Sequence, residues 1–221
     1  MAYAFVRASN QYLSVASAPL TDYPFTMACW YKINSADLAI NQTLLAIGSS
    51  TTNSRVAMTY NGGSTPRRAV QILSVSSSDV VSGTGQYEQT ISSDTWNHAA
   101  SVGNSSNIHT AYFNGLIGTS NVTTVSVSGI DRTFIGARFN PVTSAVANPL
   151  GGQMAEVGIW NTTLTNAEIA SLAKGMTCNL VRPQSLVFYA PLIRDLQDVR
   201  GGRAITNNNT ATVANHPRVY Q

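Results

Sequence analysis

Apolar and polar residues alternate along most of the chain, with the period of two that is typical of half-buried β-strands. The clearest region contains the alternating segments Trp96–Val102 and Ile108–Phe113, separated by a cluster of turn-forming residues. The dipeptide Asn114-Gly115 follows at once, and this pair readily accepts the positive φ angles of a type I′ hairpin turn. The pattern predicts an antiparallel meander whose apolar face must be covered by a second layer.

The same alternation predicts short strands on both sides of the meander. They are expected at Ala2–Ala8, Gln11–Val15, Phe25–Ile33, Thr43–Gly48, Arg55–Tyr60, Ala69–Val75, Gln86–Ile91, Val122–Val127, Thr133–Ala137, Gln153–Trp160 and Ser185–Leu192. Polar residues and turn formers predict loops at Ser76–Gly85, which we expect to be mobile, and at Asn140–Gly152.

One segment changes to a helical period. Thr165 and Glu168 form the S/T-x-x-E pattern of a capping box, and Gly175 stands where the residue after a helix is often glycine. A short helix is therefore expected over Asn166–Lys174. The many strands without βαβ alternation predict an all-β fold: a two-sheet antiparallel β-sandwich of jelly-roll type over residues 1–210. Residues 211–221 are expected to form an extended C-terminal arm.

The composition is unusually poor in charge. Charged residues make up 10% of the chain, whereas serine, threonine and asparagine together account for 66 of 221 residues. The net charge of +3 and the scattered basic residues argue against nucleic-acid binding. No apolar run has the length of about 18 residues that a membrane span needs.

A neutral polar surface is common on extracellular proteins, yet the sequence shows no Sec signal after Met1. A phage or virus particle would reconcile the two observations, because its proteins are made in the cytoplasm and released by lysis. Cys29 and Cys178 are the only cysteines. Two free, buried thiols are the favoured interpretation, and a single disulfide between strands is the alternative.

Several motifs resemble the concanavalin A-like, laminin-G-like jelly-roll family with its pentraxin-type members. They are Phe25-Thr26-x-x-x-Trp30, Trp96-x-His98-x-Ala100, Tyr112-Phe113-Asn114-Gly115, Ile135-Gly136, and the run Gly152–Asn161 followed by Leu164-Thr165 and Glu168-Ile169. The resemblance covers about residues 1–175 in the family's order. It implies a concanavalin A-like sandwich, and the segments Tyr189–Asn209 and His216-Pro217-Arg218 resemble C-terminal extensions of phage-borne and bacterial members.

Catalytic and metal-binding patterns are not recognisable. Glycosidases on this type of sandwich need two closely spaced acids, and none of the acidic residues shows such a spacing. Glu156 is expected to be a carboxylate bonded to backbone or hydroxyl, with a lone catalytic acid as the alternative. His98, His109 and His216 lack metal-ligand spacing, and His98 is expected to be a satisfied structural histidine. Some relatives bind calcium, but the sequence shows no acidic cluster that would supply its ligands. Asp195 and Asp198 are expected to cap turns, and sharing an ion with a backbone carbonyl is the alternative.

We therefore expect a non-enzymatic virion structural or decoration protein, on a capsid surface or tail, without a cofactor. Its expected partners are other virion proteins, host surface polysaccharide and further copies of the chain. The alternative is a carbohydrate-binding module of a secreted or cell-surface protein; a glycoside hydrolase is disfavoured. Trp30, Trp96 and Trp160 are expected to pack in the core or at a sheet edge, with an exposed sugar-stacking platform as the alternative. Candidate glycan or partner-binding residues are Tyr60, Asn61, Tyr87, Arg138 and Asn140, and the candidate docking arm contains His216, Arg218 and Tyr220.

Overall fold

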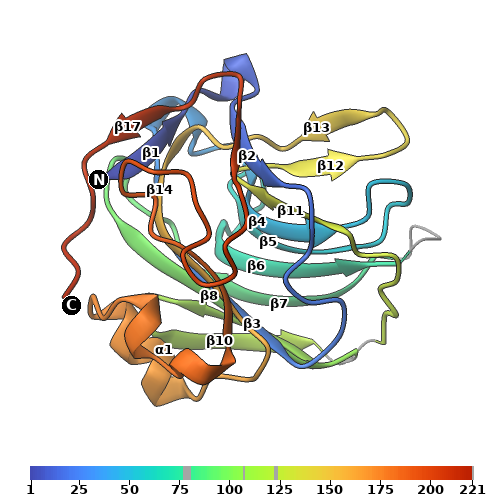
Figure 1. Cartoon of the computed structure of the whole chain (residues 1–221). Coiled ribbons are helices and arrows are strands. Elements are labelled where there is room, and N and C mark those ends of the chain that lie inside the picture. The colour runs from blue at the N-terminus through green and yellow to red at the C-terminus, as the bar shows by residue number, and fades with distance from the viewer. Residues whose placement is uncertain (77–80, 107, 122–123, 221) are drawn as a thin grey trace.

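Two antiparallel sheets stack against each other in the computed structural model, which describes residues 1–76, 81–106, 108–121 and 124–220 (Figure 1). Sheet B has the order β16 (Thr206–Asn208), β2 (Tyr12–Val15), β11 (Arg132–Ile135), β4 (Asn41–Gly48), β5 (Arg55–Asn61), β6 (Arg68–Val75) and β7 (Val81–Glu88). Sheet A has the order β10 (Leu116–Asn121), β9 (Ile108–Phe113), β8 (Asn97–Ser105), β3 (Phe25–Ile33), β14 (Gly152–Trp160), β1 (Ala2–Phe5) and β17 (Thr212–Ala214).

Smaller elements complete the sandwich. Strand β15 (Leu186–Ala190) pairs with β14, and β7 pairs with β10, which joins the two sheets at one edge. A separate hairpin is formed by β12 (Arg138–Asn140) and β13 (Ala145–Ala147). The predicted antiparallel β-sandwich with one short α-helix is confirmed. The 3-10 turns are η1 (Arg7–Ser9), η2 (Ser35–Asp37), η3 (Cys178–Leu180) and η4 (Pro183–Ser185).

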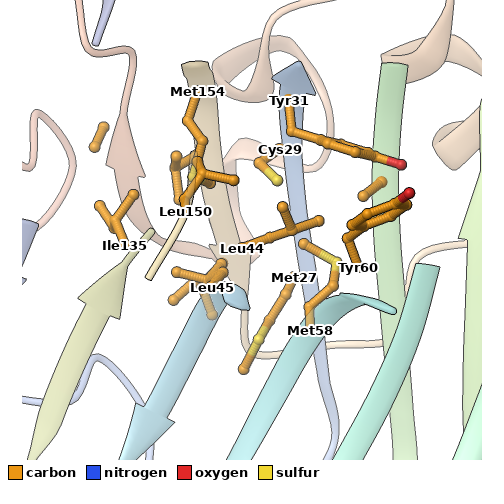
Figure 2. Packing of buried hydrophobic residues seen from close by; sticks show 14 of the residues in the cluster. Met27, Cys29, Tyr31, Leu44, Leu45, Met58, Tyr60, Ile135, Leu150 and Met154 are labelled. Carbon is orange, nitrogen blue, oxygen red and sulfur yellow. The ribbon is translucent and has the colours of Figure 1, made fainter. Parts of the chain in front are cut away.

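The main core lies between the sheets. Met27 and Tyr31 of β3 face Met58 and Tyr60 of β5, and all four side chains are fully buried (Figure 2). The Tyr31 hydroxyl crosses the core and donates to the Ala69 carbonyl oxygen at 2.8 Å. Alternation thus buries one face of each sheet, as the sequence predicted.

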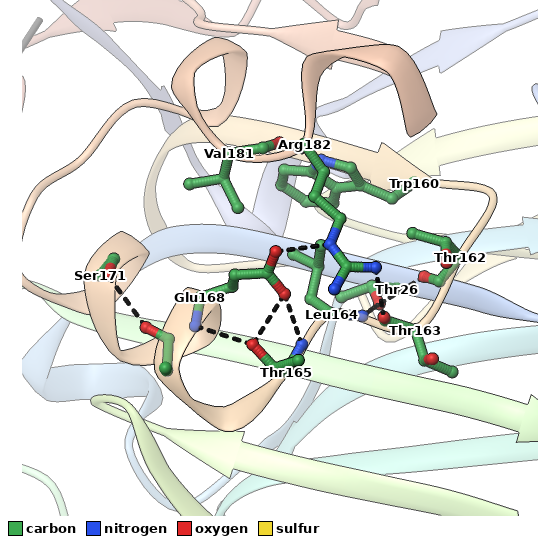
Figure 3. Close-up of polar contacts among 11 residues, drawn as sticks. Thr26, Trp160, Thr162, Thr163, Leu164, Thr165, Glu168, Ser171, Val181 and Arg182 are labelled. Carbon is green, nitrogen blue, oxygen red and sulfur yellow. Dashed lines mark hydrogen bonds and ion pairs between the residues drawn. The ribbon is translucent and has the colours of Figure 1, made fainter.

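The helix α1 (Asn166–Ala173) covers the outer face of sheet A, where Ile169 and Leu172 pack near Trp160. The predicted capping box is present, because Thr165 and Glu168 each accept from the other's backbone N–H (Figure 3). Arg182 donates to the Glu168 carboxylate and ties the helix to η4.

Replacing Thr165 with alanine is expected to lower the free energy of unfolding by about 1 kcal/mol, because the N-cap hydroxyl and its bonds are lost. Urea denaturation would measure the change. Thr163→Ala is the matched control, since no hydrogen bond of the Thr163 hydroxyl to a described residue is recorded. Equal losses in both variants would contradict the capping role.

Three expected elements differ from the structure. Strand β7 begins at Val81, inside the expected loop Ser76–Gly85, because its backbone pairs with both β6 and β10 despite its polar side chains; residues 77–80 lie outside the described part. No strand forms at residues 124–127, where the Val125 N–H donates to the Ser106 carbonyl oxygen and no ladder follows; residues 122–123 of that expected strand are not described. The expected loop after Asn140 contains the β12–β13 hairpin.

The turn prediction within the meander is confirmed. Asn114 and Gly115 have φ angles of 48° and 82°, as a type I′ turn requires. The expected C-terminal arm contributes β17 to sheet A, paired with β1. Within the described residues, no helix has the length and apolar character needed to cross a bilayer.

The two cysteines are free and buried, as favoured from the sequence. Cys29 points into the main core with Met27 and Tyr31, whereas Cys178 packs beside Trp160 on the outer face of sheet A. Sheet A therefore separates the two thiols, and burial raises the pKa of each.

Candidate ligand-binding surface

Small residues occupy the centre of the outer face of sheet B, where Ala46 and Ala57 are buried beneath larger side chains. Ala46 and Gly48 of β4 and Ala57 of β5 point outward, since their neighbours Ile47, Val56 and Met58 fill the core. Phe134, Tyr12 and Phe139 pack against the two alanines. Two pockets open on the same face.

Aromatic rings form the wall of the first pocket. Phe134 of β11 stacks with Phe139 of the β12–β13 hairpin, with ring centroids 6.0 Å apart and planes 8° apart. Tyr12 of β2 lies 6.4 Å from Phe134. The pocket has a volume of about 360 Å³ and is lined by Tyr12, Ser14, Val15, Ala16, Ser50, Arg132, Phe134, Phe139 and Thr206.

The second pocket is polar and lies over β4, β5 and β6. Its volume is about 310 Å³, and its lining contains Asn41, Gln42, Thr59, Tyr60, Asn61, Gln71, Leu73 and Asn148. Between them, the two pockets offer stacking surfaces and hydrogen-bonding groups. Such a combination suits a ligand with flat apolar faces and polar edges.

Tyr60 and Tyr87, two of the predicted binding residues, turn their rings toward the core. Tyr60 is fully buried, and its hydroxyl donates to the Leu38 carbonyl oxygen at 2.5 Å. Burial raises the pKa of Tyr60. The Tyr87 ring packs against Phe113 with centroids 5.4 Å apart. Neither ring is presented to the outer face of sheet B.

Asn61, Arg138 and Asn140 lie closer to this surface. Asn61 lines the polar pocket, and Arg138 and Asn140 flank Phe139 in β12. Burial lowers the pKa of Arg138, while the Asn140 side chain accepts from the Val142 N–H. A ligand role for these three residues stays a prediction.

The residues of the predicted docking arm lie on the side of sheet A. His216 Nε2 is 3.3 Å from Glu156 Oε1. The Tyr220 N–H donates to the Gly175 carbonyl oxygen, and the Tyr220 side chain is 68% exposed. Arg218 is exposed as well. The tail therefore lies along its own sheet and ends beside α1, and docking on a neighbour stays a prediction.

Glu156 has the structural environment expected from the sequence. It lies in a β-bulge of β14 with a φ of 52°, is 3% exposed, and accepts from the Tyr189 hydroxyl at 2.7 Å. Burial, together with the adjacent Glu156 carboxylate, raises the pKa of Tyr189. In the part of the chain that the structure covers, no three His, Cys, Asp or Glu side chains cluster as metal ligands.

Trp30 and Trp160 belong to sheet A, and Trp96 directly precedes β8 of the same sheet, so none of the three lines the two pockets of sheet B. Trp160 is fully buried and its indole N–H donates to the Val181 carbonyl oxygen, so its predicted packing role is confirmed. Trp30 lies against His98, and the Trp96 ring lies 5.6 Å from the Lys32 ammonium group.

Sequence reasoning missed Tyr12, Arg132, Phe134 and Phe139. Arg132 and Phe134 share one face of β11 by alternation, so the sequence does hold a signal for their common orientation. Phe139 comes from an expected loop, and only the fold brings it onto Phe134.

Comparisons with known proteins agree with this architecture. Residues 7–170 match the family model of the concanavalin A-like lectin/glucanases superfamily. The chain belongs to this superfamily. A search of curated proteins gave no significant match.

Solved structures of similar fold include pentraxin and carbohydrate-binding domains. A heptameric SAP-like pentraxin from Limulus polyphemus is 10% identical, with a TM-score of 0.66, 91% of this chain covered and 87% of the other. A putative carbohydrate binding protein from Bacteroides ovatus is 18% identical, with a TM-score of 0.67 and 99% of this chain covered; this chain spans 61% of the length of that protein. The CBM40 of Ruminococcus gnavus IT-sialidase, bound to α2,3 sialyllactose, is 15% identical, with a TM-score of 0.56, 70% of this chain covered and 84% of the other.

Proposed function

We propose that the protein is a non-catalytic carbohydrate-binding domain that holds a sugar in the aromatic pocket of sheet B. The observation that carries the proposal is the stacked pair Phe134 and Phe139, joined by Tyr12, at the edge of a 360 Å³ pocket. Aromatic faces pack against the apolar faces of sugar rings, and polar groups such as Ser14, Ser50 and Thr206 can bond the hydroxyl groups. The carbohydrate-binding proteins among the structural neighbours support the same function.

The acidic residues support binding over hydrolysis. Within the described residues no carboxylate lines the aromatic pocket, whereas glycosidases place two acids on either side of the scissile bond. Glu156, Glu168 and Asp198 each bond to a side chain elsewhere, namely Tyr189, Arg182 and Arg203.

Replacing Phe139 with alanine is expected to weaken sugar binding about 3- to 10-fold, because the stacking surface is lost. A glycan array, probed with and without calcium, would first find a ligand, and titration calorimetry would then compare the variants. The control is Val142→Ala, which truncates an exposed side chain in the turn of the same hairpin. Equal affinities of Phe139→Ala and wild type would contradict the site, and silence of the whole array would contradict the function.

A second proposal concerns where the domain works. The neutral, hydroxyl- and amide-rich surface favours a decoration protein on a virus particle, where many copies would turn weak sugar binding into firm attachment. Mass spectrometry of purified particles from the source would test this. Absence of the chain from such particles would overturn the virion role and leave the sugar-binding proposal in place.

A further inference from the structure

The polar pocket over β4, β5 and β6 is lined by neutral side chains. Five of them are amides, and no acidic or basic side chain belongs to the lining that the structure describes. Because Met58 fills the core, its neighbour Thr59 points outward, and so does Gln71, the register partner of Thr59 in β6. The polar pocket shares no lining residue with the aromatic pocket, so the two are separate places on the outer face of sheet B.

Two of the five amides are used by the fold itself. Gln42 Nε2 donates to the Asp37 carbonyl oxygen at 2.8 Å, and Gln42 Oε1 accepts from the Gly151 N–H at 2.7 Å. Asn41 Oδ1 accepts from the Gly63 N–H at 2.9 Å. These bonds hold the loops around the pocket, so Gln42 and Asn41 have a structural explanation.

Gln71 and Asn148 have hydrogen-bonding capacity that the fold does not use. Gln71 is 4% exposed, and its Oε1 receives only a long contact of 3.4 Å from Asn61 Nδ2. Gln71 Nε2 has no recorded bond to a described residue, and it is not among the atoms sealed from solvent. Among the described residues, Asn148 is bonded through its backbone, whose carbonyl oxygen accepts from the Thr43 N–H, and not through its side chain. Amides held in a pocket without a protein partner are groups that a bound ligand can satisfy.

The lining favours an uncharged ligand. An amide group both donates and accepts hydrogen bonds, as a hydroxyl group does, so two amides can bond neighbouring hydroxyl groups of one sugar ring. Leu73 is half-buried and gives the pocket an apolar side, on which the C–H groups of a ring can pack. A charged group would lose water here without meeting an opposite charge, because Arg68 lies outside the lining and has Glu88 opposite it in β7.

We propose that the polar pocket is a second sugar-binding site, specific for uncharged sugars, on the same face as the aromatic pocket. The Gln71 and Asn148 amides bond neighbouring hydroxyl groups of the ring, and Leu73 packs against its C–H groups. The volume of about 310 Å³ is at the lower end for ligand pockets, which suits one sugar ring better than a long chain. This site goes beyond the proposed function, because it includes neither Phe134 nor Phe139 and does not depend on them.

Proton–nitrogen correlation NMR can locate binding at this pocket through side-chain amide signals. The probes are the methyl glycosides of glucose, galactose and mannose, each compared with its uronic acid counterpart. Gln71→Met and Asn148→Gly each remove one amide and thereby identify its signal. We expect at least one neutral glycoside to shift both signals to saturation, and its uronic acid to bind at least about threefold more weakly.

Asn148→Gly is expected to weaken the binding of that glycoside about 3- to 10-fold, because one hydrogen bond is lost. Asn148 has a φ of 51°, which glycine adopts without strain, so the backbone is preserved. Ser144→Gly is the matched control, because Ser144 is exposed in the same hairpin, has a φ of 48° and lines neither pocket. It should leave the affinity unchanged, and circular dichroism would verify that each variant is folded.

The position of the shifted signals separates this proposal from the proposed function. If none of the three neutral glycosides shifts the Gln71 and Asn148 signals, or if Asn148→Gly binds as well as wild type, the second site is overturned. A uronic acid that binds as tightly as its neutral partner would overturn the preference for uncharged sugars. Shifts confined to the aromatic pocket, at Ser14 and Thr206, would leave the proposed function in place without a second site. Shifts confined to the polar pocket would support the second site and contradict the aromatic one.

Discussion

Replacing Asp198 with alanine is expected to lower the free energy of unfolding by about 3–5 kcal/mol, because three backbone N–H groups and Arg203 lose the acceptor that they share. Asp198 is fully buried in the loop between β15 and β16. Its Oδ1 accepts from the N–H groups of Tyr189, Arg200 and Gly201 at 2.9–3.1 Å, and its Oδ2 accepts from Arg203 at 2.8 Å. Truncation would orphan three backbone donors and one guanidinium at the same time. The turn-capping role expected for Asp198 is thus confirmed.

Denaturant unfolding of the two aspartate variants would measure this effect. Asp195→Ala is the matched control, because Asp195 is exposed three residues earlier in the same loop. It should change the free energy of unfolding by less than about 0.5 kcal/mol. Asp198→Asn keeps the shape and removes the charge, so it should fall between the two. A loss below about 1 kcal/mol in Asp198→Ala would show that the loop does not depend on this carboxylate.

The sequence predicts those elements whose signal is local. The Asn114-Gly115 turn and the helix start at Thr165 follow from backbone preferences and short hydrogen bonds, and both are present. Strand β7 and the β12–β13 hairpin depend on partners far along the chain. Polar and glycine residues in β7 give no local strand signal, and pairing with β6 and β10 supplies the missing stabilisation.

The candidate site was harder to predict than the fold. Alternation shows which residues share one face of a strand, but it does not show whether that face points to the core or to solvent. In β5, alternation groups Tyr60 with Val56 and Met58, which marks the buried face and could have excluded the Tyr60 ring. In β11, Phe134 and Ile135 are equally apolar, so either could face the core. The outward orientation of Phe134 becomes favourable only because Phe139 covers it.

Stability of the protein is expected to fall as the pH drops below about 6.5, because two histidines are buried in the neutral form. Burial lowers the pKa of His98 to about 3 and that of His109 to about 4. The His98 ring is 2% exposed and packs edge-on against Trp30 with centroids 5.4 Å apart. Among the described residues its Nδ1 has no hydrogen-bond partner. His98 is therefore structural, but the expectation that its ring is fully hydrogen-bonded is wrong.

His109 is buried beside two hydroxyl groups. Its Nε2 lies 3.1 Å from Ser74 Oγ and 3.0 Å from the Tyr23 hydroxyl, and no carboxylate bonds to the ring within the described part. A proton on either histidine would therefore be buried without a counter-charge.

The sign of the pH effect follows from the two depressed pKa values. Above about pH 6.5 both histidines are neutral in the folded and unfolded chain, and the full stability is present. As the pH falls, the unfolded chain binds protons first, so stability is lost from pH 6.5 down to about 4 for His109 and about 3 for His98. For the fully buried His98 the slope approaches about 1.4 kcal/mol per pH unit once the pH is well below 6.5.

Urea midpoints between pH 7.5 and 4.5 would measure this slope, with an unchanged m-value as evidence of two-state unfolding. His98→Gln should flatten the curve, because a neutral side chain takes the place of a titrating one, and His109→Gln should remove the second contribution. Most carboxylates titrate near pH 4, so the interval from 6.5 to 5 reports mainly on histidine. A wild-type midpoint that stays constant over this interval would contradict the prediction, because it would mean that the buried rings accept protons without cost.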